Sequence, residues 1–175
     1  REQMSKSRML TSSFFCELGL DLRSAMAGTL QNRAELGGLL CIAPDWDEAR
    51  FADAACRARS APLDVHCSDS DLVRLRELLF ARRMAVLVIS SNPVLLDHED
   101  FTDLLWAIFH LTDELAARGD PASLSAADRA HLDEDAARLL RQLLINWLAH
   151  MSHIRREYPN LFAHEISRNP LAAPA

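Results

Sequence analysis

Apolar residues recur with the period of an α-helix along most of this chain. The clearest early example runs from about Ser5 to Arg33, where large apolar residues return every four positions. These positions are Leu10, Phe14, Leu18, Leu22, Met26 and Leu30. Such a repeat places the apolar side chains on one face of an amphipathic helix. The pattern therefore predicts a long N-terminal helix within residues 1–35, which Gly37 and Gly38 end.

Two further helices are expected before the middle of the chain. One begins at Pro44 and runs to about Arg59, with Asp45 placed to cap its first turn. The other begins near Ser68, where Ser68-x-x-Asp71 has the pattern of a capping box. Its continuation over residues 84–89 is apolar on every side, so this segment is either a buried helix or a central strand.

The strand interpretation of residues 84–89 gives an alternative fold. Residues 39–43, 63–66 and 84–89 would then be the strands of a small parallel βαβαβ unit at about 39–90, in an α+β protein. The middle strand would be very short and would contain Asp64. No glycine-rich turn follows the first strand, so a nucleotide site is not indicated even in this fold. We therefore predict an all-α helix bundle of five or six helices and keep the α+β fold as the alternative.

The second half of the chain carries the strongest helical signals. A fourth helix is expected over residues 97–118 and ends at Gly119. A fifth is expected over residues 126–157, capped by Ser125 and stopped by Pro159, with acids early and arginines late as the helix dipole prefers. Trp106 and Trp147 fall within apolar stripes and are expected in the core. A short turn at 161–166 follows, and the tail from Asn169 is expected to fray.

Composition fits one domain over residues 1–175, with 49% apolar and 25% charged residues. The net charge of −6 argues against a nucleic-acid partner, which would require a basic face. The four cysteines are too scattered for a zinc knuckle and are expected to be buried free thiols in the cytoplasm. The sequence shows no signal peptide and no membrane span. Because it begins at Arg1, we expect it to be excised from a longer chain.

Candidate chemistry is sparse. His150 and His153 lie one helical turn apart, and a neighbouring helix could add Asp97, Glu99 or Asp100, so a metal site is geometrically possible. The Glu-x-x-His pattern of di-iron bundles is absent, and surface histidines beside dipole-compensating acids are the ordinary interpretation. No nucleophile elbow, phosphate loop or zincin motif occurs. We predict that the protein is not an enzyme, with no catalytic residue, cofactor or resident metal.

Four segments of the second half also carry a family resemblance. They read NPVLLDHEDFTDLLWAIFHLTDEL at 92–115, NWLAHM at 146–151, YPNLF at 158–162 and RNP at 168–170. In this order they resemble the cytoplasmic C-terminal region of a family of prokaryotic ion-channel proteins that have a two-helix, potassium-channel-like pore. The resemblance covers about residues 64–170 and is closest over 92–170. The pore, with its Gly-Tyr-Gly filter, is absent from this sequence.

The resemblance implies a non-catalytic cytoplasmic regulatory or assembly domain of a potassium-type ion channel. Its partners would be the channel's own membrane pore domain and neighbouring subunits of a homo-oligomer, a tetramer because such pores are fourfold. It would lie on the cytoplasmic side of an inner membrane, with Arg1, Lys6 and Arg8 as juxtamembrane positive charges. The alternative is a stand-alone soluble helical protein that acts by protein–protein interaction. The third candidate is a metal-binding helical bundle that uses His150, His153 and the acids near Asp97.

Overall fold

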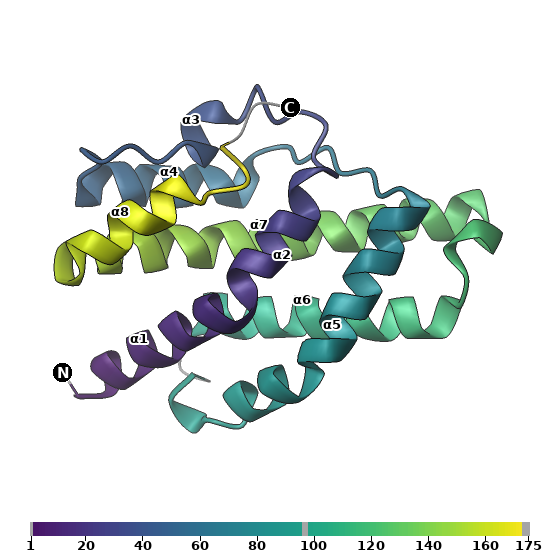
Figure 1. Cartoon of the computed structure of the whole chain (residues 1–175), viewed down its shortest axis with the longest axis horizontal. Helices are drawn as coiled ribbons and strands as arrows, with labels where there is room; N and C mark the ends of the chain where they lie inside the picture. The colour runs from purple at the N-terminus through teal and green to yellow at the C-terminus, as the bar shows by residue number, and fades with distance from the viewer. Residues whose placement is uncertain (1, 96–97, 173–175) are drawn as a thin grey trace.

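The chain forms an assembly of packed helices, shown in Figure 1. The computed structural model describes residues 2–95 and 98–172, with side chains from Arg8 onward except that of Leu95. Across these ranges the β pairing is limited to a single antiparallel bridge between Leu30 and Val65. The predicted all-α fold is confirmed, and the α+β alternative is wrong. The supposed strands fail because residues 84–89 continue a helix and residues 63–66 supply only one side of that bridge.

Helix α7 (Ala126–Glu157) is the longest element, and its 32 residues span about 48 Å. Its bounds match the predicted ones because Ser125 caps it, accepting a hydrogen bond from the backbone N–H of Asp128 at 3.1 Å. Helix α6 (Glu99–Arg118) ends at Gly119, whose φ of 70° is accessible mainly to glycine. A short connection with the 3₁₀ turn η3 (Pro121–Ser123) then reverses the chain. The two helices lie side by side and antiparallel (Figure 1).

Helices α4 (Glu48–Ser60) and α8 (Pro159–Ser167) cover another side of α7, near the short α3 (Gly37–Leu40) (Figure 1). The cap of α4 is Asp47 and not the predicted Asp45, because Asp47 accepts from the backbone N–H of Arg50 at 2.8 Å. The expectation that the tail frays from Asn169 onward is wrong for residues 169–172. Asn169 donates to the carbonyl of Leu40 at 2.7 Å, and Leu171 is buried. Residues 173–175 lie outside the described residues.

The N-terminal helix is shorter than predicted. It comprises α1 (Glu2–Phe14), a π-helical turn η1 (Phe15–Gly19) and α2 (Leu20–Ala27), after which residues 28–36 form turns. In the π-helical turn, a Cβ on Gly19 would overlap the ring of Phe15, so a glycine is required there. The turn thereby positions the buried ring of Phe15 toward α7, where it stacks on His150.

Helix α5 (Asp69–Ser90) starts at the predicted capping box, in which Ser68 and Asp71 cap each other. It packs against α6 and α2. The segment 84–89 is helical but not fully buried as expected, since Met84, Leu87 and Val88 are exposed. The 3₁₀ turn η2 (Pro93–Leu95) follows.

Trp147 is buried as predicted, whereas Trp106 is 69% exposed, so the expectation of a core position for Trp106 is wrong.

The burial of the cysteines differs in part from the expectation. All four cysteines are free, but Cys16, Cys41 and Cys56 are exposed, so the expectation of buried thiols holds only for Cys67. Burial raises the pKa of the Cys67 thiol to about 12, which keeps it protonated and unreactive.

None of the helices in the described part of the chain carries an apolar stretch of the length that crossing a membrane requires.

Candidate functional site

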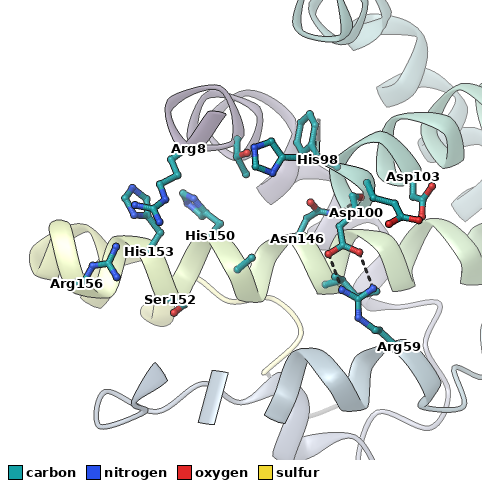
Figure 2. Close-up of a pocket in the computed structure, with 15 residues that line it drawn as sticks. Arg8, Arg59, His98, Asp100, Asp103, Asn146, His150, Ser152, His153 and Arg156 are labelled. Carbon is teal, nitrogen blue, oxygen red and sulfur yellow. Dashed lines mark hydrogen bonds and ion pairs between the residues drawn. The ribbon is translucent and has the colours of Figure 1, made fainter. Parts of the chain in front are cut away.

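A cavity of about 680 Å³ opens between α1, α4 and the facing parts of α6 and α7. Figure 2 shows the side chains that line it. Helix α1 contributes Arg8, α4 contributes Arg59, the start of α6 contributes residues 98–101 and Asp103, and α7 contributes residues between 145 and 156. This size lies within the range of about 300–1,000 Å³ typical of small-molecule sites. We call this cavity the α1–α7 pocket.

One end of the α1–α7 pocket is fixed by polar contacts among three helices. Arg59 donates two hydrogen bonds of 2.7 Å to the two carboxylate oxygens of Asp100 (Figure 2). Asn146 of α7 donates to the backbone carbonyl of Asp100 at 2.8 Å and to that of Gln142 at 2.9 Å. The bidentate pair and the amide together tie α4 and the first turn of α6 to α7.

The other end of the pocket carries two imidazoles and a guanidinium. His150 is buried, and its ring stacks on Phe15 with centroids 4.9 Å apart. Burial lowers the pKa of His150 to about 4, with the positive charge of Arg23 adding to the effect. Burial and the positive charge of Arg8 also lower the pKa of His153. His150 is therefore neutral at pH 7, and Figure 2 shows the side chain of Arg8 extending toward His153.

Two polar groups at this end have no hydrogen-bond or ion-pair partner among the described residues. The buried Nδ1 atom of His153 makes no hydrogen bond within the described structure. Arg8 pairs with no carboxylate among the described residues. Arg156 differs, since it donates to Glu48 at 3.0 Å and to Glu157 at 2.8 Å. The guanidinium of Arg8 is thus available to an anion at this end of the pocket.

The lowered pKa of His150 predicts an acid-sensitive fold. Between pH 6.5 and pH 4 the unfolded chain binds a proton at this imidazole and the folded chain does not, so stability is lost as pH falls through that window. We expect the His150→Gln variant to lose about 1–2 kcal/mol less than the wild type between pH 7 and pH 5. Urea unfolding at the two pH values measures this difference. Equal losses in the two proteins would contradict a neutral, buried His150.

The residues of the metal hypothesis are only partly brought together. His150, His153, Glu99 and Asp100 all line the α1–α7 pocket, whereas Asp97 lies outside the described residues. Both oxygens of Asp100 are engaged by Arg59, and His150 is packed on Phe15. Sequence reasoning missed Arg8, Arg59 and Asn146 as lining residues. Of these three residues, only Asn146 could have been found from the sequence, because it is a polar residue inside the apolar stripe of α7.

The arrangement defines a helical domain with a mixed-charge pocket, and comparison with known proteins identifies its family. Residues 3–167 match the family described as "Uncharacterized protein MJ1433, C-terminal helical domain", so this chain belongs to that family. It is 32% identical over 168 residues to Uncharacterized protein MJ1433 of Methanocaldococcus jannaschii. The alignment covers 95% of this chain and 67% of that relative. No solved structure matches the chain.

This family membership corrects the resemblance to a channel domain. The match includes the segments at 92–115 and 146–151 that carried the resemblance, and it points to the MJ1433 helical domain and to no channel family. Those segments form amphipathic helices that pack against each other as α6 and α7. Apolar stripes of this kind recur in unrelated helical bundles, and this is why the segments resembled those of a channel domain. The cytoplasmic location remains a prediction.

Proposed function

We propose that this domain is a non-catalytic binding module whose α1–α7 pocket accepts the anionic group of a small molecule. The observation that carries the proposal is Arg8, which lines the pocket beside His153 and lacks a carboxylate partner among the described residues. A guanidinium presents its N–H groups in a planar fork that matches a carboxylate or a phosphate. The anionic group would bind between Arg8 and the imidazoles.

Local charge favours this assignment in spite of the net charge of −6. After burial, the next largest cause of the lowered pKa is the positive charge of Arg23 at His150 and that of Arg8 at His153, where Glu157 acts in the opposite direction. Positive potential inside a concave site concentrates anions there. At the opposite end of the pocket, Arg59 pairs with Asp100, while Glu99 and Asp103 add negative charge. The pocket therefore favours a ligand with its negative charge at one end.

The non-catalytic part of the proposal rests on the geometry around His150. Ser12 Oγ lies 3.5 Å from Nδ1 of His150, which exceeds the separation of about 2.6–3.2 Å between a nucleophile and its base. A pKa of about 4 also makes this imidazole too weak a base to activate a hydroxyl at neutral pH. The two side chains are better suited to holding a ligand than to transforming one.

Anion binding predicts a rise in thermal stability that depends on Arg8. With inorganic phosphate or citrate as the probe, against chloride at equal ionic strength, we expect the unfolding temperature to rise with concentration. Arg8→Ala should weaken binding by about 10–100-fold, because one charge-assisted contact is lost. Calorimetric titration measures the affinities. The control is Arg83→Ala, which removes an exposed arginine of α5 that lies 3.9 Å from Asp113.

The outcomes of this titration separate the possibilities. Binding that is lost in Arg8→Ala and kept in Arg83→Ala supports the pocket. Equal binding by both variants, or no binding of either anion at millimolar concentration by the folded wild type, would overturn the proposal.

Contact with another protein is a second candidate function, favoured by one face of α5. Its second half exposes large apolar side chains at spacings of four, three and one, which places them on one side of the helix. They are Phe80, Met84, Leu87 and Val88. Exposed apolar faces of this kind are typical of interaction surfaces. Light scattering of the wild type and of Met84→Glu distinguishes self-association from contact with a different protein.

A further inference from the structure

Two adjacent helices carry the same spacing of metal-binding residue types. Helix α6 has His110-x-x-x-Glu114, and α7 has His131-x-x-x-Asp135. Residues four apart lie on one face of a helix, so each histidine is stacked beside its own carboxylate. Because α6 and α7 form an antiparallel hairpin, the two pairs face each other on the side of the connection at residues 119–125. None of these four residues lines the α1–α7 pocket.

Ligand atoms of His110, His131 and Asp135 all lie within 4.8 Å of one another, close enough to surround a single ion. Nε2 of His110 lies 3.0 Å from Oδ2 of Asp135, and Nε2 of His131 lies 3.3 Å from the same oxygen. Nε2 of His131 also lies 3.4 Å from Oε2 of Glu114. Nitrogen and oxygen ligands at about 2.0–2.2 Å from a tetrahedral ion are about 3.3–3.6 Å apart. The separations of 3.0 and 3.3 Å between the imidazoles and Asp135 are therefore close to the edges of such a tetrahedron.

Asp135 supplies a second, independent observation. Its side chain is 1% exposed, and its Oδ2 atom makes no hydrogen bond within the described structure although two imidazole nitrogens lie within ion-pair distance. A buried carboxylate oxygen left without a hydrogen bond is unfavourable. The other oxygen, Oδ1, accepts from Arg138 at 3.0 Å, which fixes the orientation of the carboxylate. Oδ2 is thus directed to the place where an ion would bind.

We propose that His110, His131 and Asp135 form a binding site for a divalent transition-metal ion, with Zn²⁺ as the ion that this donor set favours and Glu114, which neighbours His131, at the edge of the site. Two imidazoles and a carboxylate without a thiolate suit zinc. Calcium and magnesium prefer all-oxygen sets. Both imidazoles are 43% exposed, so the ion can enter from solvent. Glu114 itself accepts from Arg118.

Zinc titration of the chelator-treated chain tests the proposal. Calorimetry should show one Zn²⁺ per chain, and Co²⁺ should give the visible absorption of a tetrahedral site. His131→Ala and Asp135→Asn should each weaken zinc binding by on the order of 100-fold or more, since loss of an outer-shell partner alone costs roughly 10–100-fold. Circular dichroism of the metal-free variants checks that they are folded.

His66→Ala is the matched control. Nδ1 of His66 lies 3.0 Å from Asp133, and Nε2 lies 3.6 Å from Asp64. His66 is therefore also flanked by carboxylates, but its contacts do not converge on one point where an ion could bind. Zinc binding kept in His66→Ala and lost in His131→Ala supports the site. Equal affinity of His131→Ala and wild type, equal weakening by His66→Ala, or no zinc bound by the folded wild type would each overturn it. In the last case, the two histidines serve only as ion-pair partners of Asp135.

Discussion

Trp147→Ala is expected to lower the free energy of unfolding by about 4 kcal/mol, the largest effect of any single substitution that we consider. Trp147 is 0% exposed on α7, the helix against which α4, α6 and α8 pack. Truncation would leave a cavity that the packed helices cannot fill. It would also remove the ring over which the guanidinium carbon of Arg23 lies, 4.5 Å from the centroid.

Trp106→Ala is the matched control for this prediction. Trp106 lies on the adjacent helix α6 but is 69% exposed, so its truncation should change stability by no more than about 0.5 kcal/mol. Urea unfolding followed by circular dichroism measures both variants without relying on the tryptophan signal. Similar losses in the two variants would contradict the burial of Trp147.

Glu165→Ala is expected to cost about 3 kcal/mol, because it would leave a buried charge without its partner. Arg23 is fully buried on α2, and its Nη2 atom lies 3.3 Å from Oε2 of Glu165 on α8. Burial lowers the pKa of Arg23 to about 10, so the guanidinium remains charged at pH 7. Besides Glu165, it donates from Nε to the carbonyl of Gly19 at 3.3 Å. Removal of the carboxylate therefore takes away its main compensation.

Two further variants show whether the buried charge is the cause. Glu48→Ala removes a carboxylate from an exposed pair with Arg156, and it should cost no more than about 1 kcal/mol. Adding Arg23→Met to Glu165→Ala should restore part of the lost stability, because an apolar side chain then replaces the unpaired charge. Equal losses for Glu165→Ala and Glu48→Ala would argue against a buried ion pair in the folded chain.

The helical architecture could be predicted from the sequence because local signals coincide with the packing. The Ser68 capping box starts α5, and Ser125 and Pro159 bound α7. Burial was harder to predict. Trp106 belongs to the same apolar stripe as Leu105 and Ile108, but only those two are covered by neighbouring helices. An apolar stripe indicates that a segment is helical, but it does not indicate how much of the stripe a neighbouring helix covers.

Most of the candidate sites could not be predicted, because they depend on contacts between distant helices. The spacing of His150 and His153 pointed to one end of the α1–α7 pocket. The position of Arg8 depends on how α1 crosses α7, which no local pattern specifies. The partners of Asp135 likewise depend on the register of α6 against α7. Arg23 appeared to be an ordinary charged residue until the fold placed Glu165 beside it, 142 positions away.

Nuclear magnetic resonance of the histidine rings during a phosphate titration tests the binding module most directly. If the anion binds beside Arg8, the ring signals of His150 and His153 should shift together and saturate with one affinity. The rings of His66 and His164, which lie outside the α1–α7 pocket, should not move. Saturable shifts confined to His150 and His153 are the predicted result. Unchanged signals at both residues, or equal shifts at all four rings, would contradict the proposed function.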